Sequence, residues 1–200
     1  MTAGYDGPET FCDRERETAD LVSAIENGRN VTLIAPRRYG KTGLIRNVMR
    51  VLADRYDTVY IDIYATESLS DFARIFAERV VSSLETKREK VVSTLGRFFG
   101  SLRPTVSPQP DGSVKWSFDL AQPEAKASLE GTFEFLKSRK RPIMIAIDEF
   151  QQVRKYPEAN TEALLRSYIQ FLPDVHFVFA GSQLRLMSGM FVSPRGAFYN

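Results

Sequence analysis

Cysteine and histidine are almost absent from this chain of 200 residues, which holds one of each, Cys12 and His176. A single thiol cannot close an internal disulfide, and one cysteine with one histidine cannot build a zinc site. The sequence therefore excludes a disulfide-stapled secreted domain and a His/Cys metal centre. A reducing, cytoplasmic setting is the expectation that follows.

Long apolar runs are also missing. The longest ones, residues 143–147 and 175–180, have the length of buried strands and fall far short of the roughly 20 residues that span a bilayer. Residues 1–13 carry acids and glycines, where a secretion signal needs a basic start and an apolar run. We therefore expect neither a membrane segment nor a secretion signal.

The chain also has little net charge. Its 27 basic and 25 acidic residues leave +2, too little to indicate nucleic-acid binding on its own. With 43% hydrophobic and 26% charged residues, a chain of this length can bury a core of its own. The composition predicts a globular chain of one domain, or of one domain and a fragment, and we expect a single domain over residues 1–200.

Short apolar strands alternate with amphipathic helices along the chain. Such near-continuous apolar strands are typical of a parallel sheet covered by helices on both faces, which is the α/β class. Ligands of these sheets bind outside the carboxyl ends of the strands. The expected strands are 31–35, 58–64, 143–147 and 175–180, and the expected helices are 15–27, 41–54, 68–102 (one long helix or two in register), 124–140, 161–172 and 183–190.

Residues 103–123 interrupt this alternation. Pro108 and Pro110 rule out a helix, Asp111-Gly112 is a hairpin turn pair, and apolar residues alternate from Val114 to Leu120. We predict an inserted β-hairpin or ordered loop outside the central sheet.

A phosphate-binding loop is predicted between the first strand and the next helix. Its backbone amides and the helix N-terminus would hold phosphates, Lys41 would reach the β- and γ-phosphates, and the Thr42 hydroxyl would ligate Mg²⁺. A side chain at Gly40 would block the approach of phosphate. Ala35 stands where the usual pattern has glycine. Arg37 and Arg38 fit a contact with phosphate or with a neighbouring subunit, and they fit solvated loop charges equally well. The expected nucleotide-binding residues of the loop are Pro36, Arg37, Arg38, Tyr39, Gly40, Lys41, Thr42 and Gly43.

Two carboxylates follow the apolar strand 143–147 directly. Asp148 fits a partner of Mg²⁺ that acts through water, and Glu149 fits the general base that polarises the attacking water. The alternative is a plain helix N-terminus, where acids interact favourably with the helix dipole.

Three motifs together resemble the P-loop ATPases of the AAA-like and STAND group, especially the archaeal-type ATPase family. They are Phe11-Cys12-Asp13-Arg14-Glu15, similar to that family's Phe-x-x-Arg-Glu motif, then the Pro-Arg-Arg-x-Gly-Lys-Thr loop, and Ile-Asp-Glu-Phe at 147–150. The resemblance implies a P-loop NTPase fold that takes ATP or ADP with Mg²⁺. It also implies that Phe11 and Arg14 line the base and sugar. The alternative for these two is a hydrophobic staple and a surface charge that open the first helix.

In this group the strand beside the catalytic strand ends in a polar sensor of the γ-phosphate. Ser182 and Gln183 both match that position. The sequence leaves the choice open, because a one-residue error reverses the facing of a strand end. The expected catalytic residues are Glu149, Lys41, Ser182 and Gln183, and the expected metal ligands are Thr42 and Asp148.

Similar ATPases continue past the sensor strand into a fifth strand, a helical lid and often a winged helix. We expect the lid and any effector domain to be absent from residues 1–200, and nucleic acid to be bound only through such a missing domain. A homo-oligomer and a protein partner are both compatible with the sequence, which leaves the oligomeric state and the source of any arginine finger open.

The leading interpretation is an Mg²⁺-dependent ATP-binding and ATP-hydrolysing module that acts as a molecular switch or motor element. The alternative is a nucleotide-binding regulatory module with negligible turnover. A small-molecule kinase is a third hypothesis, but the Asp148-Glu149 pair suits water activation and no arginine-rich lid is visible.

Overall fold

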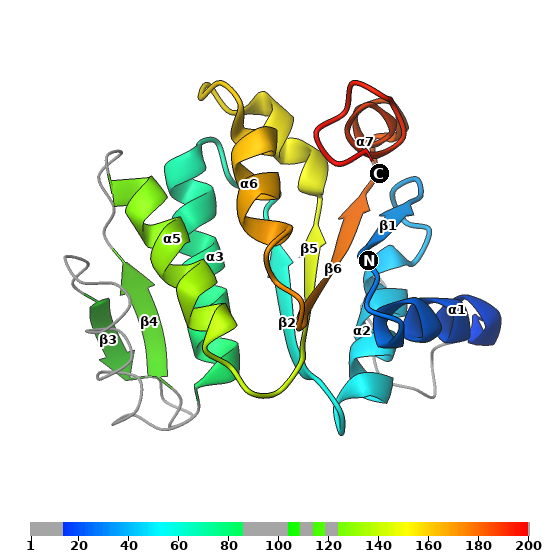
Figure 1. The fold of residues 1–200 in the computed structure, drawn as a ribbon, viewed down its shortest axis with the longest axis horizontal. Helices are drawn as coiled ribbons and strands as arrows, with labels where there is room; N and C mark the ends of the chain where they lie inside the picture. The colour runs from blue at the N-terminus through cyan, green and yellow to red at the C-terminus, as the bar shows by residue number, and fades with distance from the viewer. Residues whose placement is uncertain (1–13, 86–103, 109–113, 119–123, 200) are drawn as a thin grey trace. The chain divides into compact units, whose positions relative to one another are not determined.

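The structure is a computed structural model that describes residues 14–85, 104–108, 114–118 and 124–199. Figure 1 shows the order of the elements, which is α1 (Glu15–Glu26), β1 (Val31–Ile34), α2 (Lys41–Leu52), β2 (Asp57–Asp62), α3 (Leu69–Leu84), β3 (Pro104–Pro108), β4 (Val114–Phe118), α5 (Glu124–Lys137), β5 (Ile143–Asp148), the 3₁₀ helix η2 (Phe150–Lys155), α6 (Thr161–Ile169), β6 (Val175–Gly181) and α7 (Leu184–Phe191).

The chain divides into two compact units. The first is drawn from Met1–Tyr64, Arg141–Gln151 and Pro173–Asn200, and the second from Ala65–Lys140 and Gln152–Leu172. That residues 1–200 form one P-loop domain remains a prediction. None of the helices in the described part of the chain is long and apolar enough to cross a bilayer.

The central sheet belongs to the first unit. Its four strands run parallel in the order β1-β6-β5-β2, and every residue of β5 and β6 is buried. Parallel strands end at one edge of the sheet, and the arrowheads in Figure 1 mark that edge. The predicted α/β class and parallel sheet are confirmed.

Helices α1 and α2 cover one face of this sheet. Their apolar residues recur at helical spacing, so one side of each helix is buried against the strands. This core consists of Leu21, Ile25, Leu44, Ile45, Val48 and Leu52 from the helices and Met144, Ala146, Val178 and Ala180 from the sheet.

An aromatic cluster packs on the opposite face of the same sheet. Phe179 points away from the face that carries Val178, because side chains alternate along a strand. Its ring lies 4.6 Å from that of Phe150, 5.1 Å from that of Phe191 and 5.4 Å from that of Phe198, measured between centroids. These contacts anchor the start of η2 and the segment after β6 to the sheet.

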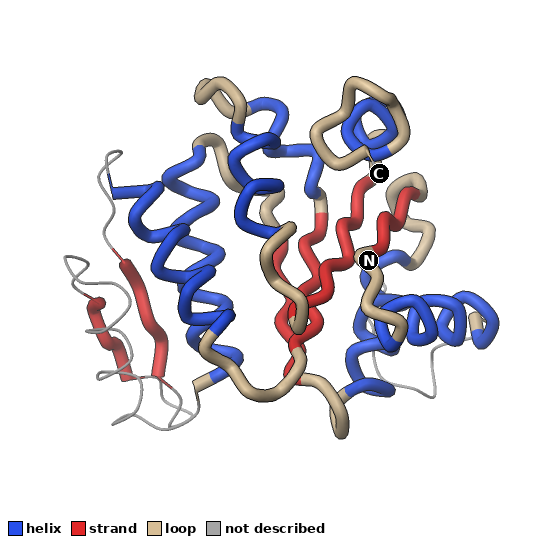
Figure 2. Tube along the Cα trace, viewed as in Figure 1, coloured by secondary structure: helices blue, strands red, loops and turns tan. Residues whose placement is uncertain are grey.

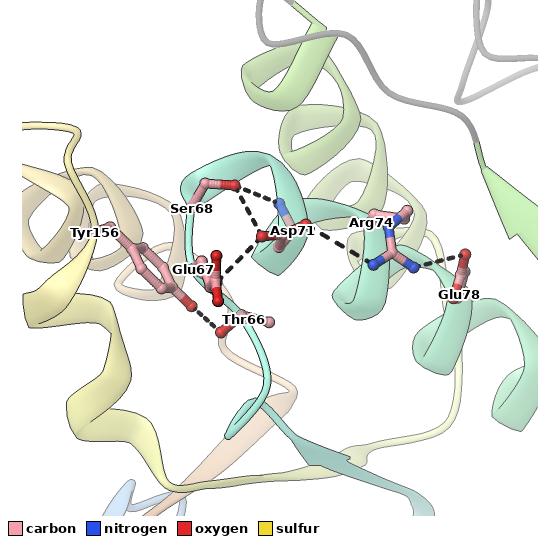
Figure 3. Close-up of polar contacts among 7 residues, drawn as sticks. All are labelled: Thr66, Glu67, Ser68, Asp71, Arg74, Glu78 and Tyr156. Carbon is pink, nitrogen blue, oxygen red and sulfur yellow. Dashed lines mark hydrogen bonds and ion pairs between the residues drawn. The ribbon is translucent and has the colours of Figure 1, made fainter.

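The second unit holds α3, α5, α6 and the hairpin β3–β4. Helix α3 begins with a capping arrangement, shown in Figure 3: the Ser68 hydroxyl accepts a hydrogen bond from the Asp71 amide at 3.1 Å, and the Asp71 carboxylate accepts one from the Glu67 amide. The hydroxyls of Thr66 and Tyr156 are hydrogen-bonded beside it.

The hairpin and the helix before it test two predictions. β3 and β4 pair antiparallel in a sheet of their own, which confirms the predicted hairpin outside the central sheet. The predicted turn pair Asp111-Gly112 lies outside the described residues. A single helix over 68–102 is wrong, because Glu85 is extended (φ −117°, ψ 109°) and α3 ends at Leu84. The rest of that range is not described.

Candidate functional site

The predicted phosphate loop joins β1 to α2 at the carboxyl edge of the sheet (Figure 2). Gly40, the residue before α2, has φ 70°, a left-handed conformation that glycine adopts without strain. A Cβ at this position would meet the Arg14 guanidinium at 3.7 Å, an ordinary contact. Within the protein, backbone conformation rather than crowding therefore calls for glycine. The close approach of a phosphate remains a prediction.

Lys41 is the buried cation of this loop. Its side chain is 7% exposed, and its ammonium donates to the carbonyls of Ala35 at 2.9 Å and Pro36 at 3.3 Å. No carboxylate among the described residues forms an ion pair with it. The first amides of a helix also have no intrahelical partner. The start of α2 therefore carries an excess of positive charge that suits a bound anion.

Arg14 ties the start of α1 to the phosphate loop. Its guanidinium donates to the carbonyl of Tyr39 at 2.5 Å. Arg14 also lines a cleft of about 420 Å³ between α1 and α2, together with Glu15, Thr18, Ala19, Val22, Asn47 and Val51. The contact places Arg14 beside the phosphate loop, and its place at the base and sugar of the nucleotide remains a prediction. Phe11 lies outside the described residues.

Asp148 is the buried carboxylate of the site and is 5% exposed. Its Oδ2 accepts hydrogen bonds from the Thr42 hydroxyl at 2.9 Å and the Tyr60 hydroxyl at 2.8 Å. Its Oδ1 accepts the amide of Glu149 at 2.9 Å. The bond from Thr42 holds this carboxylate against the first turn of α2, and the bonds from Tyr60 and Glu149 fix its orientation.

Tyr60 is a site residue that no motif predicted. It pairs in register with Ala146, two residues before Asp148, so its side chain lies on the same face of the sheet. Burial, and then the charge of Asp148, raise the pKa of Tyr60, which keeps the hydroxyl a donor. The guanidinium of Arg46 lies 4.0 Å from the centre of its ring. The alternation of side chains along a strand would indicate the face on which Tyr60 lies, but its place beside Asp148 depends on the pairing of β2 with β5, which the sequence does not show.

The expected metal ligands fit Mg²⁺ only in part. Thr42 and Asp148 offer a hydroxyl and a carboxylate, the hard oxygen donors that Mg²⁺ prefers. In residues 14–85, 104–108, 114–118 and 124–199, no three His, Cys, Asp or Glu side chains gather as ligands. The remaining ligands of an Mg²⁺ ion here would be water and nucleotide oxygens.

Glu149 follows Asp148 with φ 56°, a conformation that costs a residue with a side chain about 1 kcal/mol. Its Oε2 accepts hydrogen bonds from the Gln151 amide group and from the Ser182 hydroxyl, the latter at 2.9 Å. Gln183 is the N-cap of α7, and its side chain makes no capping bond. Of the two sensor candidates, Ser182 is therefore the one beside Glu149.

The tip of the loop is exposed at Pro36, Arg37, Arg38 and Tyr39, and Gly43 lies in the first turn of α2. The Arg37 guanidinium lies 5.2 Å from the centre of the Tyr64 ring. A hydrogen bond with Tyr64, and then the charges of Tyr64 and Glu149, raise the pKa of Arg37. Arg38 has φ 67°, left-handed like Gly40. The structure thus gathers permanent positive charge at the loop and two carboxylates opposite it.

Three solved structures share this fold. A Walker-type ATPase of Pyrococcus abyssi has a TM-score of 0.55 at 22% identity, over 96% of this chain and 52% of that one. The ORC1 protein of Aeropyrum pernix, solved with DNA, has a TM-score of 0.59 at 19% identity, and the match covers 90% of this chain and 44% of that one. Cdc6p of Pyrobaculum aerophilum has a TM-score of 0.55 at 15% identity, and the match covers 99% of this chain and 46% of that one.

These likenesses, all below 25% identity, bear on the fold alone. The chain spans about half the length of each of the three proteins. No functionally curated protein matches it.

The sequence profile of one family covers most of the chain. Residues 11–180 match a family described as an ATPase domain predominantly from Archaea. This range includes the phosphate loop, Asp148 and Glu149. The resemblance stated from the three motifs is therefore confirmed, and the chain belongs to this family of archaeal-type ATPase domains.

Proposed function

We propose that this chain binds ATP with Mg²⁺ and hydrolyses it to ADP and phosphate, as a molecular switch or motor element. Membership of the ATPase family supports nucleotide binding at the coarse level. The contact between Thr42 and Asp148, with Lys41 one residue before Thr42 and Glu149 one residue after Asp148, is the observation that carries the finer proposal.

In this mechanism the loop holds the nucleotide and the carboxylates act on the metal and on water. Lys41 and the first amides of α2 would bind the phosphates. Thr42 and Asp148 would hold Mg²⁺, which when bound neutralises charge on the phosphate oxygens. Arg14 would lie toward the base and sugar, and Phe11 would join it there.

Glu149 would activate the attacking water. Its Oε2 is occupied by two donors, whereas its Oε1 accepts no hydrogen bond from the described residues. That free oxygen can take a proton from water as the bond to the γ-phosphorus forms and ADP leaves. Ser182 would sense the γ-phosphate by turning its single O–H proton from Glu149 to a phosphate oxygen. Gln183 stays the second candidate for this role.

Calorimetric titration with ADP and ATP, with and without Mg²⁺, followed by phosphate-release assays, tests the proposal. We expect Mg²⁺-dependent binding and steady turnover. Binding without turnover in the wild-type protein would favour the regulatory module instead. A cytoplasmic setting, a homo-oligomer or protein partner, and nucleic-acid binding through a further domain remain proposals. The DNA in the Aeropyrum pernix structure is bound to the ORC1 protein and does not show that this chain binds DNA.

A further inference from the structure

Gln151 is a buried polar residue that neither the motifs nor the proposed mechanism uses. Its side chain is 1% exposed, and its Nε2 donates to Oε2 of Glu149. Its Oε1 is buried and has no hydrogen-bond partner among the described residues. A buried unpaired acceptor is unfavourable for stability, so the amide is not explained by folding alone.

The backbone between the two residues directs both side chains to one place. Glu149 has φ 56°, which turns the chain sharply after β5. Phe150 then enters the aromatic cluster, with its ring 4.6 Å from Phe179 and 5.5 Å from Phe198. Because Phe150 is anchored, Glu149 and Gln151 on either side of it meet through a hydrogen bond.

The end of β6 leaves the Gln151 amide little freedom. A Cβ on Gly181 would lie 2.5 Å from the Gln151 Oε1 and 2.5 Å from the Met187 sulfur. The absence of a side chain at Gly181 therefore makes the space in which the amide oxygen sits. The amide is confined on one side by β6 and bonded on the other to Glu149.

We infer that Gln151 is a positioning residue, which holds Oε2 of Glu149 so that Oε1 stays directed to the attacking water. This rests on the proposed role of Glu149 as general base. The Ser182 hydroxyl holds the same oxygen from the next strand, at 2.9 Å. Two donors on one oxygen fix the carboxylate plane and leave the other oxygen available.

Replacement of Gln151 by methionine tests the inference, because methionine has a similar length and volume but no donor. We expect kcat to fall about ten- to a hundredfold, the scale of a lost hydrogen bond to a charged group. KM and the affinity for ATP should stay within about twofold of wild type. The melting temperature of the nucleotide-free protein should be unchanged or higher, since an unpaired buried oxygen is removed.

Gln151→Asn is a second variant, which keeps the amide but shortens its reach, and it should lower kcat in the same way. Gln170→Met makes the same chemical change at an exposed glutamine after α6 and should leave kcat unchanged. Wild-type kcat in Gln151→Met would overturn the inference, and so would loss of the folded state in both Gln151 variants, which would make the residue structural.

The Glu149→Gln variant, measured beside these, separates the two proposals. If Glu149→Gln loses turnover while Gln151→Met keeps it, the inference fails and the proposed function stands. If Glu149→Gln keeps wild-type turnover, or the wild-type protein hydrolyses no ATP, the proposed function fails and the role of Gln151 fails with it.

Discussion

The Thr42 hydroxyl donates a hydrogen bond to Oδ2 of Asp148 across 2.9 Å, although 106 residues separate them in the chain. One residue stands in the first turn of α2 and the other at the end of β5, two strands away from β1 in the sheet. The contact joins the phosphate loop to the carboxylate pair, and it defines where the proposed Mg²⁺ would bind.

Asp148→Asn should weaken the effect of Mg²⁺ on ATP binding. The amide keeps the size of the side chain and an acceptor for Thr42, but it loses the charge that attracts the metal. We expect the gain in ATP affinity on adding Mg²⁺ to shrink about tenfold relative to wild type, as expected for an interaction with a charged group. Calorimetry in EDTA and in Mg²⁺ measures the gain, and an unchanged gain would remove Asp148 from the metal site.

Lys41→Ala should weaken the binding of ADP and ATP about ten- to a hundredfold, because a charge-assisted contact to phosphate is lost. Lys137→Ala is a matched control at an exposed lysine that pairs with Glu134 on α5. It should leave affinity unchanged. Equal affinity in Lys41→Ala and wild type, with the same circular dichroism spectrum, would show that phosphate does not bind at this loop.

Tyr60→Phe should destabilise the protein by about 1 to 2 kcal/mol, because the buried carboxylate of Asp148 loses a donor. The ring remains under Arg46, so packing is kept. Urea unfolding measures the free energy of unfolding. Tyr199→Phe, at a tyrosine that is 44% exposed, is the control and should change it little. Equal stability of Tyr60→Phe and wild type would contradict the proposed support of Asp148.

His176 should make stability sensitive to acid. Burial lowers the pKa of His176, while the nearby charge of Asp174 acts in the opposite direction. Between the lowered pKa and the unfolded value of about 6.5, the unfolded chain binds more protons, so stability falls as pH falls. The variant His176→Phe keeps an aromatic ring against Tyr56 but has no group at this position that binds a proton.

Urea midpoints of wild type and His176→Phe at pH 7.5 and at lower pH measure the effect. The wild-type protein should lose more stability on acidification than the variant, because both share every other titrating group. Parallel pH profiles for the two proteins would rule out a contribution from His176.

Much of the fold could be predicted because its central strands, β5 and β6, are buried on both faces and therefore appear in the sequence as apolar runs. The exact ends of a strand depend instead on where its neighbouring strand stops pairing with it. Ile63 and Tyr64 continue the strand pattern, but β2 ends at Asp62, opposite the last residue of β5, Asp148. The order of the strands in the sheet could not be predicted from the sequence either, because neighbouring strands come from segments that are distant along the chain.

The site was predicted where chemistry requires particular residues at fixed spacing. Lys41, Thr42, Asp148 and Glu149 follow from such motifs, and the structure brings Thr42 to Asp148. Tyr60 and Gln151 were not predicted as site residues, because each acts through a contact that only the folded chain makes. Likewise, only the folded chain shows that Ser182, rather than Gln183, contacts Glu149.

The phosphate-release rate of Glu149→Gln at saturating ATP and Mg²⁺ tests the central proposal most directly. The substituted amide can still accept hydrogen bonds from Gln151 and Ser182, so the fold and ATP affinity should be retained. Turnover should fall about 100-fold or more, the scale of a lost general base. A variant that binds ATP and releases phosphate at the wild-type rate would contradict the assignment of water activation to Glu149.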